Sequence, residues 1–247
     1  MAAQNKIALI TGANRGIGLE TARQLGQQGY TVLVAARSLE KAEGAVTELK
    51  TQGIERAVPL ALDVSDDASV QAAAAEVTEK FGKLDALVNN AGIITGEEFF
   101  GNSVADVALD AIEETFDVNL LGVIRTTRAF LPLLEKSDAG RIVNLTSILG
   151  SLTLHATEDS PIYNSKSFAY NASKAALNMY TIHLAHALAD TSIKVNAAHP
   201  GWVQTDMGGE QAPMDIVQGA KTSVDLATLG EDGPSGAYIH LGDTLPW

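Results

Sequence analysis

Short apolar runs alternate along this chain with longer segments of helical periodicity. The apolar runs, rich in Val, Ile and Leu, predict six strands, at residues 6–11, 31–36, 57–62, 84–90, 141–147 and 193–200, and a short seventh at 236–241. Between them, the periodicity predicts helices at 16–28, 39–50, 70–81, 112–135 and 167–189. Apolar strands separated by helices indicate a parallel sheet with helices on both faces.

The whole chain, residues 1–247, is predicted to form a single α/β domain. No linker, repeat or low-complexity tract divides it, and a hydrophobic content of 46% is enough for one sizeable core. The predicted architecture is a Rossmann-like, doubly wound parallel sheet of about seven strands.

The charge balance and the absence of cysteine exclude several classes of function. With 17 basic against 30 acidic side chains, the net charge is −13, which disfavours nucleic acid and anionic membranes as partners. Without cysteine there is no disulfide and no thiolate metal site. The apolar stretch before Gly12 is too short for a signal peptide, and no later run could span a bilayer. We therefore expect a soluble, cytoplasmic protein.

The first strand runs into a glycine-rich loop, TGANRGIG. Glycines allow a sharp turn after the strand and a close approach to a pyrophosphate, and the next helix presents its free N–H groups to that phosphate. Glycines at this spacing also occur in plain strand-to-helix turns, but the position after the first strand favours dinucleotide binding. The predicted cofactor residues of the loop are Gly12, Asn14, Arg15, Gly16, Ile17 and Gly18.

The end of the second strand indicates which dinucleotide is bound. An acidic residue there would favour NAD, but the chain reads VAARS, with Arg37 after an uncharged Ala36. Guanidinium groups pair well with a 2′-phosphate, so Arg15 and Arg37 predict NADP(H). The alternative is that both are ordinary surface arginines.

Two later strand ends supply further candidate contacts. Asp63 and Val64 follow the third strand, where they could contact adenine, although Asp63 could equally be a helix-cap residue. The small residues after the fourth strand, Asn90, Ala91 and Gly92, would let a ribose and nicotinamide lie against the backbone.

Two tyrosines compete for the role of proton donor. Tyr170 and Lys174 share one face of a predicted helix, whereas Tyr163, with Lys166 after it, follows a proline in a predicted loop. An ammonium about 5 Å from a phenol, at an effective dielectric of about 20, would stabilise the phenolate by roughly 3 kcal/mol, or about two pKa units. Lys174 is therefore expected to bring the pKa of Tyr170 towards neutrality.

Taken in order, the motifs TGANRGIG, NNAG, FDVNLLG, YNASK and HPGWVQTDM, with a serine after the fifth strand, resemble the classical short-chain dehydrogenase/reductase family. The resemblance spans nearly the whole chain, and the PGWVQTDMGG segment looks most like the NADPH-dependent carbonyl reductases. It implies a cofactor part at about residues 1–140 and a catalytic and substrate part at about 141–247.

The resemblance also implies individual roles. Tyr170 would be the general acid, Lys174 would bind the nicotinamide ribose, Ser147 would hydrogen-bond the substrate oxygen, and Asn119 would hold a water for proton replacement. Near the nicotinamide it places Pro200 and Gly201. The residues that follow, Trp202, Val203, Thr205 and Met207, would contact carboxamide or substrate, or merely pack under a loop.

The 148–169 segment departs from the family pattern because it is longer than usual between Ser147 and Tyr170. It is expected to form a loop or short helix beside the active site, and it leaves open whether the protein is a monomer or a small homo-oligomer. No metal site is predicted, since His183 and His186, three residues apart, have no supporting carboxylate.

The predicted function is NADPH-dependent reduction of a ketone or aldehyde, a small-molecule carbonyl substrate, to an alcohol. The alternatives within the family are a 3-oxoacyl thioester reductase and a sugar or alcohol dehydrogenase. Outside it, a non-catalytic NADPH sensor is disfavoured by the intact catalytic set, and a methyl-transfer protein by Arg37.

Overall fold

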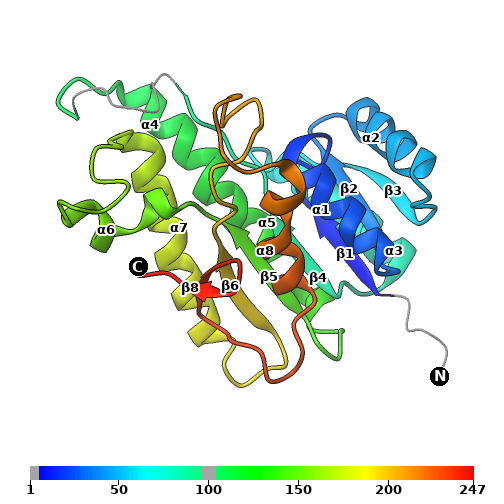
Figure 1. The fold of residues 1–247 in the computed structure, drawn as a ribbon. Coiled ribbons are helices and arrows are strands. Elements are labelled where there is room, and N and C mark those ends of the chain that lie inside the picture. The colour runs from blue at the N-terminus through cyan, green and yellow to red at the C-terminus, as the bar shows by residue number, and fades with distance from the viewer. Residues whose placement is uncertain (1–5, 96–103) are drawn as a thin grey trace.

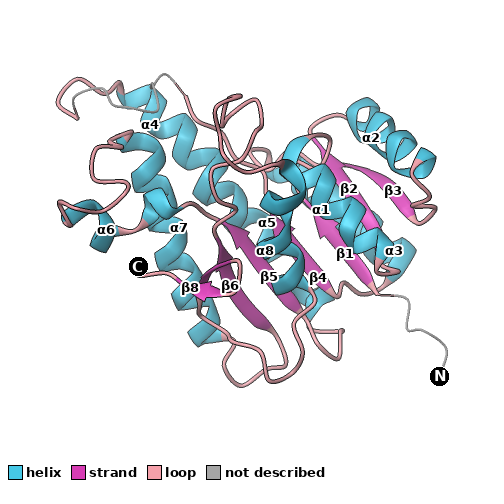
Figure 2. Ribbon diagram, in the orientation of Figure 1, coloured by secondary structure: helices cyan, strands magenta, loops and turns pink. Residues whose placement is uncertain are grey.

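The computed structural model describes residues 6–95 and 104–247, and its centre is one eight-stranded sheet (Figure 1, Figure 2). The strand order is β3-β2-β1-β4-β5-β6-β7-β8, with every neighbouring pair parallel except β7 and β8. The strands are β1 (Ile7–Ile10), β2 (Thr31–Ala36), β3 (Ala57–Ala61), β4 (Ala86–Asn89), β5 (Arg141–Leu145), β6 (Lys194–Ala198), β7 (Tyr238–His240) and β8 (Asp243–Thr244). The Rossmann-like architecture is thus confirmed, with the two-residue β8 as an addition.

Helices cover both faces of the sheet. They are α1 (Gly16–Gln27), α2 (Leu39–Thr51), α3 (Asp67–Phe81), α4 (Leu109–Phe116), α5 (Gly122–Leu134), α6 (Leu152–Ala156), α7 (Phe168–Ala187) and α8 (Ile216–Ala227). One hydrophobic cluster joins the sheet to α1, α2 and α8, and a second joins it to α3, α5 and α7. Alternate residues of β1 enter opposite clusters, because successive side chains of a strand point to opposite faces.

The sheet has its topological switch point between β1 and β4. From β1 the chain proceeds outwards to β2 and β3, then returns to β4 on the other side of β1. In sheets of this kind, ligands bind in the crevice beyond the carboxyl ends of the strands at the switch point. The glycine loop after β1, the Asn90 segment after β4 and Ser147 after β5 all lie at this edge.

The predicted helix at 112–135 is interrupted. It consists of α4, a π-helical segment at Asp117–Leu121, and α5. The interruption coincides with Asn119, whose buried side chain bonds to another segment of the chain. Helix α8 was not predicted at all, although Asp215 caps it by accepting the Gln218 N–H at 2.7 Å. No helix in the described ranges is both long and apolar enough to cross a membrane.

Candidate active site

The glycine loop is held in place by the chain segment that follows β4. The side-chain amide of Asn90 donates to the carbonyl oxygens of Thr11 and Gly12, at 2.7 and 3.2 Å. In return, the Thr11 hydroxyl accepts the N–H groups of Asn90 and Ala91, each at 3.0 Å. Gly12 has φ +63°, in the left-handed region that favours glycine. Together these bonds leave the loop little freedom.

Gly18 allows α1 to approach this network closely. A Cβ atom added at Gly18 would lie 2.5 Å from the Asn90 amide nitrogen and 2.7 Å from the Gly12 carbonyl oxygen. The absence of a side chain at Gly18 is therefore a packing requirement as well as a way to expose the helix N-terminus to a phosphate.

We expect Gly18→Ala to lower the free energy of unfolding by about 1–3 kcal/mol, because the methyl group forces apart a packed, hydrogen-bonded segment. Urea unfolding measures the change. The matched control is Gly44→Ala in α2, where an added Cβ meets no atom within 4 Å. This control is expected to stabilise the protein by about 0.5–1 kcal/mol. Equal gains in the two variants would contradict the packing role of Gly18.

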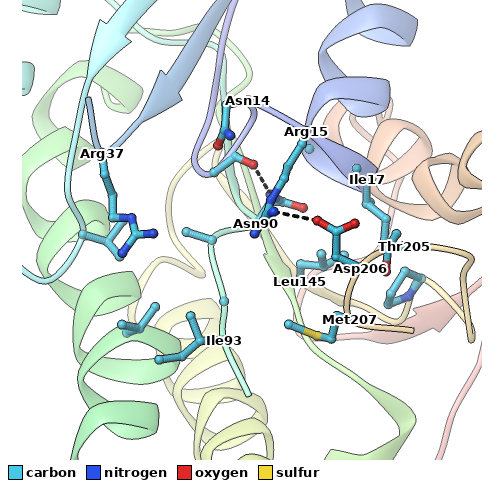
Figure 3. A pocket seen from close by; sticks show the side chains of 18 of the residues that line it. Asn14, Arg15, Ile17, Arg37, Asn90, Ile93, Leu145, Thr205, Asp206 and Met207 are labelled. Carbon is cyan, nitrogen blue, oxygen red and sulfur yellow. Dashed lines mark hydrogen bonds and ion pairs between the residues drawn. The ribbon is translucent and has the colours of Figure 1, made fainter. Parts of the chain in front are cut away.

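A cavity of about 1180 Å³ extends along the switch-point edge of the sheet (Figure 3). The predicted cofactor-binding residues that line it are Gly12, Asn14, Arg15, Gly16, Ile17, Gly18, Arg37, Asp63, Val64, Asn90, Ala91, Gly92, Tyr170, Lys174, Pro200 and Thr205. The lining residues that sequence reasoning missed are Lys41, Gly44, Ala45, Glu48, Leu62, Ser65, Ile93, Val118, Leu145, Thr146, Gln204, Asp206, Gly209, Glu210 and Ile216. Met207, predicted as a contact of carboxamide or substrate, also lines it.

Besides Trp202, four predicted site residues do not line the cavity: Asn119, Ser147, Gly201 and Val203. The side chain of Val203 is buried and packs against Gly219 of α8. Of the two roles that the sequence allows for Val203, contact with the ligand or packing under a loop, this position agrees with packing. Trp202, which also fails to line the cavity, donates its indole N–H to the Gly208 carbonyl at 2.7 Å.

The two arginines predicted to bind a 2′-phosphate have different surroundings. Arg37 is exposed beyond the end of β2, and Lys41 and Glu48 of α2 line the same cavity. Arg15 instead forms an exposed ion pair with Asp206, at 2.6 Å (Figure 3). The α2 end of the cavity therefore has two basic residues, Arg37 and Lys41, and one acidic residue, Glu48. Arg15 is instead paired with Asp206 in the loop that follows β6.

The sequence is compatible with two roles for Asp63, and the structure gives it a local one. Its carboxylate accepts both the N–H and the hydroxyl of Ser65, at 3.0 and 2.7 Å, which closes a tight turn after β3. The cap of α3 is Asp66, which accepts the Ala68 N–H at 2.9 Å. The helix-cap alternative for Asp63 is therefore wrong, and contact with adenine stays a prediction.

Tyr170 and Lys174 lie one turn apart on α7 and are both buried. The Lys174 Nζ atom lies 5.6 Å from the centre of the Tyr170 ring and donates to the Leu145 carbonyl at 2.9 Å. Burial raises the pKa of Tyr170 to about 12, although a hydrogen bond with Ser147 lowers it. Burial also lowers the pKa of Lys174 to about 8.

The expected direction of the Tyr170 pKa is therefore wrong. The i, i+4 spacing predicts that the Lys174 ammonium stabilises the Tyr170 phenolate by Coulomb attraction, in a medium of effective dielectric about 20. In the folded protein, the loss of hydration of the phenolate is the largest effect, and it raises the pKa. Tyr170 is consequently protonated at neutral pH, which is the state that a general acid requires.

Ser147 is placed next to Tyr170 by the segment that follows β5. The 148–150 segment forms a 3-10 turn, and the Gly150 carbonyl accepts a hydrogen bond from Asn178 of α7 at 3.2 Å. A Cβ atom at Gly150 would lie 2.8 Å from the Lys174 carbonyl carbon, so the turn packs directly on α7. This contact brings the hydroxyl of Ser147 within hydrogen-bonding reach of Tyr170.

The side chain of Asn119 is committed to protein groups. Its oxygen accepts the Ile93 N–H at 2.8 Å, and its nitrogen donates to the Ile93 carbonyl at 2.9 Å and to the Ser173 hydroxyl at 3.1 Å. Asn119 thus fastens the segment after β4 to the π-helical segment and to α7. Its water-holding role stays a prediction.

The 148–169 segment contains the expected short helix, α6, and forms an apolar wall beside Tyr170. Leu149 and Ile162 cluster with Tyr170, and the partly buried side chains packed on them are Ile94, Ile148 and Leu154. Tyr163 lies in a turn of this segment, where Lys166 stands 4.8 Å from the centre of its ring. The structure thus places Tyr170 in the cavity and leaves Tyr163 outside its lining.

The fold and this site define an α/β protein of Rossmann type with a glycine loop, a tyrosine and a lysine around one cavity. The family model described as "short chain dehydrogenase" matches residues 6–215. A short-chain dehydrogenase of Penicillium roqueforti (strain FM164) is 41% identical over 237 residues, which cover 93% of this chain and 92% of the relative. The chain therefore belongs to the short-chain dehydrogenase/reductase family, an oxidoreductase family that uses nicotinamide cofactors.

Two solved structures of reductases are similar to this chain. A carbonyl reductase from chicken fatty liver with NADPH bound superposes with a TM-score of 0.85, at 29% identity, covering 98% of this chain and 99% of that one. Salutaridine reductase from Papaver somniferum superposes with a TM-score of 0.82, at 30% identity, covering 94% of this chain and 98% of that one. The family resemblance seen in the sequence is thereby confirmed, and a carbonyl reductase is among the similar solved structures.

Proposed function

We propose that this protein reduces a ketone or aldehyde to an alcohol with NADPH, using Tyr170 as general acid. The observation that carries the proposal is the arrangement of Ser147, Tyr170 and Lys174. A buried phenol is hydrogen-bonded to a serine hydroxyl and has a lysine one helical turn away, at the end of a cavity lined by the glycine loop.

The residues present fit a nicotinamide dinucleotide. A Cβ atom at Gly12 would lie 3.0 Å from the Ala91 Cα atom, so the close approach of the two segments that form the cradle depends on the absence of a side chain at Gly12. Gly92 lies beside Lys174, whose Nζ atom would be 3.6 Å from a Cβ atom there. Lys174 would hold the nicotinamide ribose at this point, and the glycine loop with the N-terminus of α1 would hold the pyrophosphate.

Tyr170 and Ser147 act on the substrate oxygen, and Lys174 acts on Tyr170. Bound NADPH supplies a hydride to the carbonyl carbon, which leaves negative charge on the oxygen. Tyr170 transfers its proton to that oxygen, and Ser147 donates a hydrogen bond that orients it and stabilises the developing charge. Lys174, largely protonated at neutral pH because its pKa is about 8, stabilises the phenolate that remains.

The wall formed by Leu149, Ile162 and Ile94 favours an apolar substrate. These hydrocarbon side chains cluster with Tyr170, the proposed proton donor. A ketone with a hydrocarbon skeleton fits this environment better than a polyhydroxylated sugar, since buried hydroxyl groups without partners cost free energy. A turnover screen with activated ketones, aldehydes and sugars, using each cofactor in turn, tests the proposal, and inactivity towards every carbonyl compound would contradict it.

The cofactor preference is proposed to depend on Arg37. We expect Arg37→Asp to weaken use of NADPH relative to NADH by about 100-fold, because the carboxylate removes a bidentate partner of the 2′-phosphate and repels it. The measurement is kcat/KM for each cofactor with one ketone. Arg128→Asp, a change outside the cavity lining, is the matched control and should keep the wild-type ratio. An unchanged ratio in Arg37→Asp would refute the role of this arginine.

A further inference from the structure

His199 is a buried histidine between the catalytic serine segment and the loop that follows β6. It follows β6 directly and precedes Pro200, and 7% of its surface is exposed. Its Nδ1 atom lies 3.1 Å from the Ile148 nitrogen and 3.4 Å from the Gly201 nitrogen. Backbone N–H groups can only donate, so Nδ1 is the acceptor of both bonds and the ring proton resides on Nε2.

These two bonds join parts of the site that are far apart in the chain. Ile148 directly follows Ser147, whereas Gly201 begins the segment that leads to Thr205 and Asp206 at the cavity. Gly201 has φ +91°, and a Cβ atom there would lie 3.1 Å from Cε1 of His240. The conformation and packing of the turn at Gly201 are therefore possible only for glycine. The N–H group of this glycine donates to His199.

The surroundings keep His199 neutral and hold the serine segment from a second side. Burial, together with a smaller contribution from the nearby His240, lowers the pKa of His199 to about 3. The His240 Nδ1 atom lies 2.9 Å from the His199 carbonyl oxygen, and the two ring centres are 4.7 Å apart. From β7, the hydroxyl of Tyr238 donates to the Ser147 carbonyl oxygen.

We propose that His199 is a positioning residue for carbonyl reduction: through Nδ1 it fixes the backbone next to Ser147 relative to the turn at Gly201. The distance between the Ser147 hydroxyl and the cofactor-binding side of the cavity is then fixed, and the substrate carbonyl lies between the two. This inference rests on the proposed function. His199 touches neither substrate nor cofactor in this account and acts only through Ser147 and Gly201.

Three substitutions separate positioning from packing. Asn places its amide oxygen where Nδ1 stands, Gln places its amide one bond further away, and Leu fills the space without an acceptor. We expect His199→Leu and His199→Gln to lower kcat by roughly 10- to 100-fold, with KM for the ketone and Kd for NADPH little changed, because a misplacement of about 1 Å is enough for such losses. His199→Asn should recover most of the activity.

The control is His183→Leu on α7, an exposed histidine whose loss should leave kcat unchanged. Equal activity of the Leu, Gln and Asn variants would overturn the proposal. It would show that a hydrogen-bond acceptor at the position of Nδ1 is not needed and that the side chain serves only for packing. Should the Leu variant fail to fold, the comparison of Gln with Asn decides the question alone.

The ring nitrogens of His199 can also be observed directly by ¹⁵N NMR of the wild-type protein. We expect Nδ1 to be an unprotonated, pyridine-type nitrogen at neutral pH, and a proton on Nδ1 would overturn the proposal. This readout does not depend on turnover. Failure of the proposed function would appear as a wild-type protein inactive towards every carbonyl compound, whereas failure of this inference would appear as an active wild type with an equally active Gln variant.

Discussion

Replacing Tyr170 with Phe is expected to lower kcat for ketone reduction by about 10³-fold, a loss typical of removing a general acid. Phe retains the ring that packs with Leu149 and Ile162 and removes only the hydroxyl hydrogen-bonded to Ser147. The fold and the glycine loop should therefore be unaffected. NADPH should bind with nearly unchanged Kd, measured by the fluorescence of the nicotinamide.

Tyr163→Phe is the matched control for this experiment. Tyr163 lies in a turn outside the cavity lining, so loss of its hydroxyl should leave kcat close to the wild-type value. The opposite pattern, an active Tyr170→Phe variant and an inactive Tyr163→Phe variant, would show that Tyr163 is the proton donor and would refute the role of Tyr170. Loss of NADPH binding in Tyr170→Phe would mean instead that the hydroxyl serves the cofactor.

The features that the sequence predicts well are local in the chain. The glycine loop needs only a strand, a turn and the start of a helix, and the Tyr170–Lys174 pair needs only one helical turn. Helix α8 can also be predicted from neighbouring residues, because Asp215 is a cap residue and apolar positions recur after it at helical spacing. The sequence therefore contains the pattern for α8, although the helices predicted above do not include it.

The features that could not be predicted depend on distant contacts or on burial. The Arg15–Asp206 ion pair joins residues 191 positions apart. The bonds from Asn119 to Ile93 need the segment after β4 to lie against the π-helical segment, and nothing in the spacing of the two residues indicates this. The direction of the Tyr170 pKa likewise depends on how completely the phenol is buried, which the i, i+4 spacing does not specify.

Replacing Lys174 with Met is expected to abolish turnover, with a loss at least as large as that of Tyr170→Phe, of about 10³-fold. Met fills similar space but leaves no ammonium to hold a ribose or to stabilise the Tyr170 phenolate. Because Lys174 is buried, the same substitution should change how stability depends on pH.

The sign of that dependence follows from the lowered pKa of Lys174. In the folded protein the pKa is about 8, whereas in the unfolded chain it returns to 10.5. Between these values the unfolded chain binds more protons, so the free energy of unfolding of the wild type rises with pH, by about 3 kcal/mol over the whole window. Tyr170 acts oppositely only above pH 10, because burial raises its pKa from 10.0 to about 12.

Urea unfolding at several pH values from about 8 to about 10, where Lys174 titrates and Tyr170 does not, measures the effect. The wild type should gain stability across this range, and Lys174→Met should not. Lys136→Met, at an exposed position after α5, should keep the wild-type slope. A wild-type slope in Lys174→Met would show that the ammonium is hydrated in the folded protein. The expected result would instead show that a group needed for turnover destabilises the fold at neutral pH, because its charge is held out of water.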